Sequence, residues 1–347
     1  MRSKRTGQGK GDASYFAPHV PPFTLGGRKR NGDNGGKHYT PWLVIRAQVG
    51  DDGSRPLPGG EVFWESPDVW VTSTLGVNQP VPGQANTVFA RVSNLGLQDA
   101  VGVFVEFYWV DPSLAINLAN ANLIGIGSVD VTAGSAAVAT CPTPWVPVIE
   151  NGGHECLIAE AFLPASDPLT APLDPVDDRH VGQKNEQLVL AQPGQHMKVR
   201  LKAANIAGFA QALTIDVQGL RLTQIPALLS VRNIDRARAL TPAPGVLPLS
   251  LDMAEHTRTF CGPSATFARR LLSMTLQEVA GTAQAWVQPA QISHRESFEP
   301  WETRSIEVAG QVPPNAQLGQ VFAFRVIQRA GLIAIGGYTI YVVVTGS

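Results

Sequence analysis

Hydrophobic and polar residues alternate with a period of two along much of this chain, a pattern that predicts β-strands with one buried face rather than helices. The clearest run lies between Val101 and Trp109, where every second residue is apolar. Phe104, Glu106 and Tyr108 fall on the opposite face of the same segment. Because both faces carry large side chains, we expect a central strand here.

Further apolar segments flank this run, with turns rich in Pro, Gly and Asn between them. The predicted strands include residues 69–71, 88–92, 101–109, 123–131, 136–141, 156–163 and 186–191. About seven strands at this spacing over residues 66–192 are typical of one immunoglobulin-like β-sandwich. We expect the last of them, residues 186–191, to complete that sandwich.

The same alternation returns in residues 193–347 and predicts a second sandwich. Its predicted strands include residues 197–201, 213–217, 306–308, 321–327 and 338–344, the last of them after a turn at Gly336-Gly337. Between them, residues 264–279 have apolar residues at helical spacing behind Ser264 as a cap, so one amphipathic helix is expected. The predicted fold class is therefore all-β, with two immunoglobulin-like β-sandwiches in tandem.

Residues 1–40 differ from the rest because they are basic, rich in Gly and almost without periodic hydrophobicity. They hold eight Lys or Arg and two Asp, a local net charge of +6 against -1 for the whole chain. Such a segment cannot bury enough apolar surface to order alone, so we expect a flexible basic arm that extends from the N-terminus and orders on a partner. Residues 41–65, with apolar clusters on either side of a polar turn, are expected to form an extended leader lying on the following domain.

Composition agrees with a turn-rich β protein, since 34 Gly and 27 Pro stand against only 16% charged residues. No apolar core follows the first charges, as a classical signal peptide requires. No run reaches the roughly 18 to 20 apolar residues of a transmembrane segment, so none is expected. We therefore expect a cytoplasmic or particle-associated protein.

A Pro-Gly-Gln turn and a strand ending in V-x-N-x-G stand out in the predicted first sandwich. The segments are Ser66-Pro67-Asp68-Val69-Trp70-Val71, Pro82-Gly83-Gln84, Arg91-Val92-Ser93-Asn94-Leu95-Gly96 and Lys184-Asn185. Together they resemble the bacterial cell-adhesion-related domain called CARDB, over roughly residues 66–191. The resemblance implies a seven-stranded sandwich used as a spacer or binding module. The chain departs from simpler members in residues 142–153 and 164–178, so no loop-borne function is carried over.

Three cysteines are an odd number, which excludes a full disulfide framework. A bond between Cys141 and Cys156 is left open, because it depends on which strands are neighbours. His154-Glu155-Cys156 is the one local trio of reactive side-chain types. Consecutive residues of a strand point to opposite faces, so we expect a turn His followed by a core Cys rather than a metal or catalytic site.

Asp174, Asp177, Asp178 and His180 form the densest acidic cluster, in a loop before the predicted last strand of the first sandwich. Carboxylate oxygens from such a loop are suitable calcium ligands, but the spacing lacks the Gly and the terminal Glu of an EF-hand loop. We favour a solvated loop over a calcium site, and leave the calcium site open.

No G-x-S-x-G elbow, phosphate-binding Gly loop or Cys-x-x-Cys pair occurs in the sequence. We therefore expect no catalytic residue, no cofactor and no metal, and a protein that is not an enzyme. The expected function is that of a structural or interaction protein, a scaffold or spacer of a bacterial or phage-like multi-protein assembly. The alternatives are a carbohydrate- or surface-binding adhesion module and an accessory region of a hydrolase.

Other protein subunits are the expected partners, bound through the N-terminal arm and through open sandwich edges, whose unpaired backbone groups accept a further strand. Phe104, Tyr108, Trp145 and Trp301 are candidate exposed contact points. Nucleic acid is not expected, because the sandwiches lack a basic stripe with interleaved aromatic residues. Homo-oligomerisation is left open.

Overall fold

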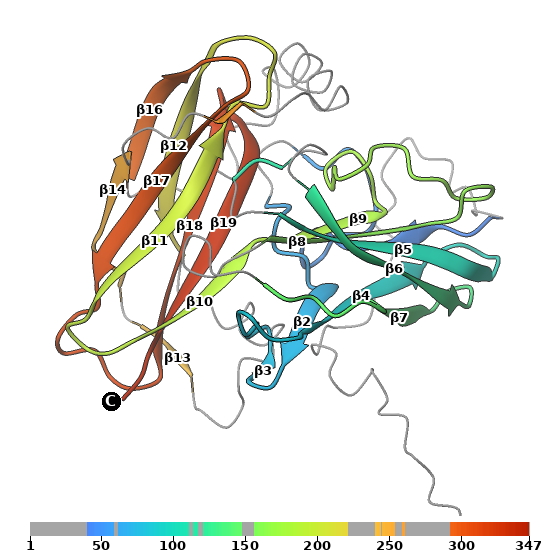
Figure 1. The fold of residues 1–347 in the computed structure, drawn as a ribbon, viewed down its shortest axis with the longest axis horizontal. Helices are drawn as coiled ribbons and strands as arrows, with labels where there is room; N and C mark the ends of the chain where they lie inside the picture. The colour runs from blue at the N-terminus through green and yellow to red at the C-terminus, as the bar shows by residue number, and fades with distance from the viewer. Residues whose placement is uncertain are drawn as a thin grey trace, which may run out of the picture.

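The computed structural model describes residues 40–58, 62–110, 114–116, 121–147, 156–220, 240–243, 245–253, 259–260 and 292–346. Every regular element among these residues is a strand, and the strands form four sheets (Figure 1). The prediction of an all-β fold is therefore confirmed. In this part of the chain no helix is long and apolar enough to cross a bilayer. The helix predicted at residues 264–279 and the basic arm up to residue 39 lie outside the described ranges.

Two of the sheets pack face to face and are called the first sheet pair. One has the order β1-β4-β2-β3, with β7 also on β4, and consists of β1 (Leu43–Val44), β2 (Val69–Ser73), β3 (Gly76–Val77), β4 (Thr87–Asn94) and β7 (Ala136–Thr140). The other has the order β6-β5-β8-β9 and consists of β5 (Ala100–Val110), β6 (Ala121–Val131), β8 (Cys156–Phe162) and β9 (Val181–Lys184). A core that includes Val88, Val105 and Phe107 lies between them.

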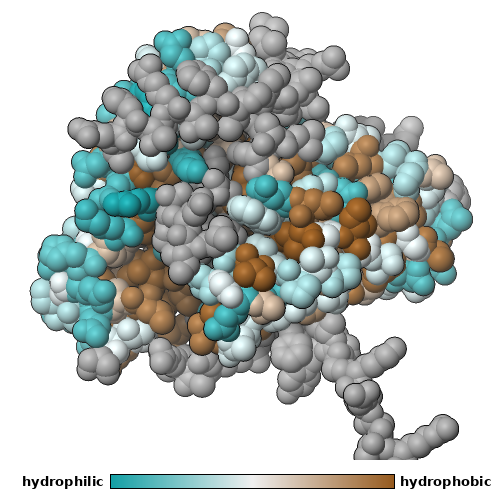
Figure 2. All heavy atoms as spheres, viewed as in Figure 1, coloured by the Kyte–Doolittle hydropathy of each residue, from teal (hydrophilic) through white to brown (hydrophobic). Residues whose placement is uncertain are grey.

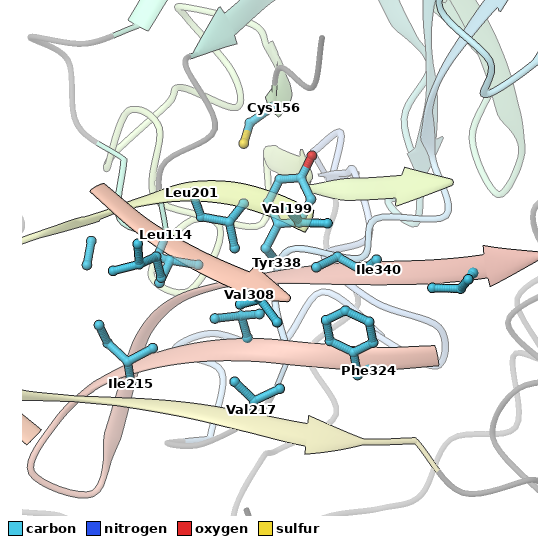
Figure 3. Close-up of a cluster of buried hydrophobic side chains, with 14 of the residues drawn as sticks. Leu114, Cys156, Val199, Leu201, Ile215, Val217, Val308, Phe324, Tyr338 and Ile340 are labelled. Atoms are coloured by element: carbon cyan, nitrogen blue, oxygen red, sulfur yellow. The ribbon is translucent and has the colours of Figure 1, made fainter. Parts of the chain in front are cut away.

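The other two sheets form the second sheet pair. One has the order β11-β17-β14, with β15 also on β17, and consists of β11 (His196–Ala204), β14 (Leu249–Met253), β15 (Thr259–Phe260) and β17 (Glu302–Gln311). The other has the order β10-β19-β18-β12-β16, with β13 also on β18, and consists of β10 (Glu186–Ala191), β12 (Gln211–Gly219), β13 (Thr241–Pro242), β16 (Ile292–Phe298), β18 (Gln320–Ala330) and β19 (Ile333–Val344). Val199 and Val308 face Phe324 and Ile340 across this core (Figure 3).

The strand β8 contributes to both cores, which explains why its sequence is apolar without alternation. Leu157 and Ala159 pack in the core of the first sheet pair, whereas Cys156 and Ile158 pack in the core of the second. Successive side chains of a strand point to opposite faces, so a strand with a core on each side buries both sets. Val110 of β5 and Val181 of β9 also pack in the second core, so part of the β5-β8-β9 sheet is a wall between the two interiors.

The sequence pattern predicted that residues 186–191 complete the first sandwich, but the corresponding strand, β10, belongs to the second sheet pair. It lies parallel to β19, with Glu186 opposite Thr339, at the edge of a sheet in the second pair. The crossing occurs at Asn185, whose backbone N–H donates to the Trp64 carbonyl and whose carbonyl accepts from the Thr339 N–H. The prediction was wrong because β9, not β10, occupies the edge beside β8.

Gly336 and Gly337 lie within β19 and do not form the predicted turn. A Cβ at Gly336 would come within 1.5 Å of the Leu114 carbonyl oxygen, and one at Gly337 within 2.2 Å of the Trp64 ring. Both intruding groups belong to segments that precede the second sheet pair in sequence. Glycine inside a strand marks a close approach of another group, and here it admits Leu114, which reaches into the core drawn in Figure 3.

The strand β5 begins with an irregularity that changes the expected role of Val101. Its register on β6 shifts between Ala100 and Val103, and Gly102 takes a positive φ of 67°. The Gly102 N–H donates to the Asp130 carboxylate at 2.7 Å. Val101 is thereby turned outward and is 71% exposed. The prediction that it joins Val103 on the buried face is wrong, because the bulge breaks the alternation at this point.

The predicted leader joins the first sheet pair directly. Its strand β1 pairs with β4 through Leu43 opposite Asn94 and Val44 opposite Ser93. The side chain of Asn94 also accepts the Trp42 N–H at 3.1 Å. Two residues of the leader are therefore part of the sheet.

Candidate functional site

The segment from Phe63 to Ser66 crosses from the first sheet pair to the second. Glu65 is buried and accepts hydrogen bonds from Arg325, through Nε at 2.7 Å and through Nη2 at 3.0 Å. The Thr339 hydroxyl donates to the same carboxylate and accepts from Trp64 Nε1 at 3.2 Å. We call Trp64, Glu65, Arg325 and Thr339 the junction clamp. It ties the end of the leader to two neighbouring strands, β18 and β19.

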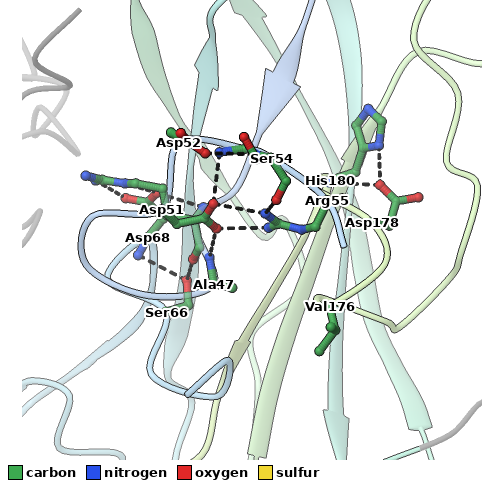
Figure 4. Close-up of polar contacts among 12 residues, drawn as sticks. Ala47, Asp51, Asp52, Ser54, Arg55, Ser66, Asp68, Val176, Asp178 and His180 are labelled. Carbon is green, nitrogen blue, oxygen red and sulfur yellow. Dashed lines mark hydrogen bonds and ion pairs between the residues drawn. The ribbon is translucent and has the colours of Figure 1, made fainter. Parts of the chain in front are cut away.

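The acidic loop before β9 is buried, so the prediction of a solvated loop is wrong. Asp174, Asp178 and His180 are each less than 5% exposed. The His180 ring has Nδ1 2.5 Å from Asp178 Oδ1 (Figure 4). On its other side, Nε2 lies 3.3 Å from Asp167 Oδ1. Asp177 lies at the loop surface and is half-buried. The loop folds inward because its carboxylates are used to hold its own backbone.

The carboxylates of this loop accept hydrogen bonds mainly from backbone N–H groups. Asp178 accepts from Thr170 and Ala171, and Asp174 accepts from Val176 and Asp177. Burial opposes the ionisation of Asp178, but the hydrogen bonds from His180 and from the backbone hold its pKa well below the usual range. Burial likewise opposes charge on His180, yet the two aspartates beside it raise its pKa.

These contacts describe an ion-pair network and not a set of metal ligands. Within the described ranges no group of three or more His, Cys, Asp or Glu side chains is placed to hold a metal ion. Asp167 instead binds Arg179 and accepts the Leu43 N–H at 2.6 Å. The Arg179 guanidinium lies 3.6 Å from the centroid of the Trp42 ring. The network therefore fastens the acidic loop onto the leader.

A second polar cluster, formed by the leader and by Asp68 just after it, lies beside the acidic loop (Figure 4). Asp51 accepts the Ala47 N–H and forms a bidentate pair with Arg55 at 2.9 Å for both contacts. Asp68 forms a similar pair with Arg46, at 2.7 and 2.6 Å. Both aspartates are buried, and both are used to fix backbone and guanidinium groups. This cluster is therefore structural in its chemistry.

Two glutamates face each other across β5 and β8, on the side of the sheet away from the first core. Glu106 lies opposite Glu160, and Tyr108 donates a 2.5 Å hydrogen bond to Glu106. Burial raises the pKa of Glu160 to about 7, although its carboxylate accepts the Leu173 N–H. Like charges directly opposite are unfavourable, so a proton on Glu160 relieves the pair. The Glu160 carboxyl group is therefore expected to titrate near neutrality.

We expect Glu160→Gln to flatten the dependence of stability on pH. The folded-state pKa of about 7 lies above the ordinary glutamate pKa of 4.5, so the folded chain retains a proton that the unfolded chain releases between these values. Stability contributed by Glu160 is therefore full below about pH 4.5 and is lost as pH rises toward 7. The loss is at most about 3 kcal/mol, from 1.36 kcal/mol per pKa unit. Urea unfolding of both chains between pH 5 and 8 measures it.

Glutamine keeps an oxygen that accepts the Leu173 N–H, so the variant removes the titration and preserves the contact. His180 also loses stability as pH rises through its raised pKa, in both chains. Its charge interacts with that of Glu160, so the two titrations are coupled. The difference between the two pH profiles therefore reports the titration of Glu160 together with its coupling to His180. Parallel profiles would show that this carboxyl group titrates normally.

The two cysteines that were candidates for a disulfide are both free and buried. Cys141 lies in the core of the first sheet pair and Cys156 in that of the second, so they face different interiors. Burial raises the pKa of the Cys141 thiol, which lowers its reactivity. Of the trio around Cys156, His154 and Glu155 lie outside the described residues.

The candidate exposed aromatics divide into two groups. Phe104 is 46% exposed, Tyr108 and Trp301 are half-buried, and Trp145 is only 3% exposed, so the prediction for Trp145 is wrong. Trp145 is held inward by reciprocal backbone hydrogen bonds with Asn86, both at 2.8 Å. Figure 2 shows apolar surface over the part of the first sheet pair where Figure 1 places β5 and β6. Exposed apolar residues of these strands are Val101, Phe104, Leu123 and Ile126.

A hollow lies where the edges of the two sheet pairs meet, and together with the solvent space at its mouth it measures about 580 Å³. On one side it is lined by the β2–β3 hairpin and by Trp145, and on the other by β10 and by Tyr341 of β19. Its polar side chains are Asn78, Gln79, Lys184, Glu186 and Gln187. No sequence motif pointed to it, because its walls come from segments that are distant in sequence. It is the candidate binding site, and the junction clamp is the candidate structural site.

No family model and no curated protein matches this chain. Among solved structures, a family 123 glycoside hydrolase from Clostridium perfringens aligns with 47% of this chain and 23% of its own length, at 8% identity and a TM-score of 0.27. The chain thus spans less than a quarter of that hydrolase. Red sea bream transglutaminase aligns with 80% of this chain and 31% of its own length, at 10% identity and a TM-score of 0.21. The CupB6 tip adhesin from Pseudomonas aeruginosa aligns with 89% of this chain and 99% of its own, at 8% identity and a TM-score of 0.19.

Proposed function

We propose that this chain is a non-catalytic structural or interaction protein, a scaffold or spacer in a bacterial or phage-like multi-protein assembly. In this proposal the two sheet pairs are immunoglobulin-like sandwiches in tandem, the first of them CARDB-like, and they act as one rigid body. The observation that carries the proposal is the junction clamp, in which Glu65 and Arg325 form a buried bidentate pair between them. A spacer must keep the distance between its ends, and a clamped junction does so.

The cost of moving one sheet pair relative to the other supports this interpretation. Domains joined by small polar interfaces move freely by default. Here the motion would separate buried opposite charges and withdraw Leu114 from the second core. It would also pull the Trp64 ring from the space left by Gly337. Each step exposes apolar area or strands a buried charge, so the closed arrangement is strongly preferred.

Protein subunits are the proposed partners, through the basic N-terminal arm and the sheet edges. The exposed apolar residues of β5 and β6 add a second contact region beside such an edge, since β6 ends its sheet. Unpaired backbone groups at an edge accept a strand from a partner, while apolar side chains next to it give that contact affinity. This arrangement suits an assembly in which one chain touches several neighbours.

Deleting residues 1–39 is expected to weaken association without changing the melting temperature. The deletion removes the basic arm but none of the described residues, so both cores stay intact. Co-purifying subunits and native mass, compared between full-length and truncated chains, measure the association. A matched variant with Arg28, Lys29 and Arg30 changed to Gln separates charge from apolar docking, because only charge attraction weakens steeply with salt. Equal native mass and equal partners for all three chains would contradict the assembly role of the arm.

A further inference from the structure

The hollow between the sheet pairs has the chemistry of a small-molecule site. Asn78, Gln79 and Gln187 place three side-chain amides around it. Each amide carries both donors and an acceptor, which matches a hydroxyl group, itself both donor and acceptor. Trp145 and Tyr341 add aromatic surface, and aliphatic side chains complete the lining. A few convergent polar groups in a mainly apolar concavity are typical of ligand sites.

The charges at the hollow favour a neutral ligand over an anion or a cation. Lys184 and Glu186 line it together, with Nζ 3.5 Å from Oε2. Their side chains are 8% and 6% exposed, so the two charges compensate each other where water is largely excluded. A phosphate or a free amine would have to compete with this pair. A hydroxyl-bearing ligand instead accepts from Lys184 and donates to Glu186 while the pair stays intact.

The wall that faces β10 is held in place before any ligand arrives. Asn86 accepts the Val81 N–H at 2.9 Å, and its amide donates to the Val81 and Trp145 carbonyls at 3.1 and 3.2 Å. Asn78 takes a positive φ of 57° while its N–H donates to the Val71 carbonyl at 2.8 Å. One buried amide thus joins the hairpin end to the segment that carries Trp145. Such pre-organisation lowers the entropy lost on binding.

Trp145 supplies an independent sign of a polar ligand. Its indole Nε1 is buried, and no described residue accepts a hydrogen bond from it. A buried donor without an acceptor is costly, which makes an arriving acceptor favourable. We propose that the hollow binds one neutral sugar ring, the terminal pyranose of a glycan, held by the amides, the Lys184–Glu186 pair and Trp145. This inference stands apart from the spacer function, because it rests on the lining of the hollow and not on the junction clamp.

Binding is tested on the intact chain by saturation-transfer difference NMR with methyl glycosides of glucose, galactose, mannose and N-acetylglucosamine. At least one of them should give a signal, and inorganic phosphate should not compete with it. Trp145→Phe keeps the ring but removes the donor, and should weaken binding about tenfold, equivalent to about 1.4 kcal/mol. Gln187→Leu keeps side-chain volume and should weaken it to a similar degree.

Two further variants decide whether the site is the hollow. Val77→Trp places a large ring in it and should abolish the signal, whereas Gln317→Ala, at an exposed turn outside the lining, should leave binding unchanged. Melting curves identify any variant that fails to fold, and Gln79→Ala, at a half-buried residue after the hairpin, then replaces it. The absence of signal with every glycoside would overturn the proposal. So would displacement by phosphate, or binding that survives Val77→Trp in a folded chain.

Discussion

Val105→Asp is expected to unfold the first sheet pair, with a loss of more than about 4 kcal/mol. Val105 is fully buried in the core between the two sheets. A carboxylate at this position would be surrounded by apolar side chains, Val103 and Phe107 among them, and would find neither water nor a cation there. Because β8 belongs to both cores, disorder in the first pair should also lower the stability of the second. Circular dichroism and urea titration measure the change.

Val101→Asp is the matched control on the same strand. The side chain of Val101 is 71% exposed beside the bulge, so a carboxylate there stays hydrated. We expect a change within about 0.5 kcal/mol, as for other surface substitutions. Equal losses for both variants would show that the bulge is absent and that the simple alternation continues through residue 101.

Arg325→Ala is expected to cost about 3 to 5 kcal/mol, the usual result of removing one partner of a buried ion pair. The change leaves Glu65 buried with its charge no longer compensated by a guanidinium group. The junction should therefore open before either core melts, so the single thermal transition becomes two. Small-angle scattering should show a larger radius of gyration between the two transitions, where the junction is open and the cores are still folded. A single transition at an unchanged temperature and scattering would contradict the rigid-spacer proposal.

Two controls define this experiment. Arg200→Ala removes a partner of Glu307, which lies on β17. The Arg200 side chain is 66% exposed, so the free energy of unfolding should fall by less than about 1 kcal/mol. Combining Arg325→Met with Glu65→Gln removes both charges and keeps most of the volume. This double variant should recover much of the loss, because an uncharged pair carries no stranded charge.

The strands could be predicted from the sequence, but their partners could not. Alternation in β5 and β12 reflects a local rule, that every second side chain meets the core, and this rule is visible in the residues themselves. The placement of β10 depends instead on which edge is vacant after β9 has taken the position beside β8. That is a property of the whole sheet. The same limit applies to Gly336-Gly337, where a turn signal and a close-approach signal look alike.

The candidate sites were harder to predict because their groups come from distant segments. Glu65 and Arg325 are 260 positions apart, and nothing near either residue identifies the other. The acidic loop could be recognised in the sequence as a cluster of aspartates. Its burial, however, depends on Arg179 and on the backbone N–H groups that donate hydrogen bonds to its carboxylates. From its composition alone, the loop was expected to be hydrated. The contact of Arg179 with Trp42 of the leader, which helps to bury the loop, appears only in the folded structure.

The parallel pairing of β10 with β19 has a consequence for the order of folding. The first strand is synthesised long before the second, since β11 to β18 lie between them in the chain. Until β19 appears, one edge of β10 has no native partner, and the Trp64 ring and Leu114 have no glycines to pack against. Closing so long a loop is slow on entropic grounds. The nascent chain therefore passes through a stage in which its first half is complete but its inner wall is exposed, and at that stage it is most open to aggregation and to chaperones.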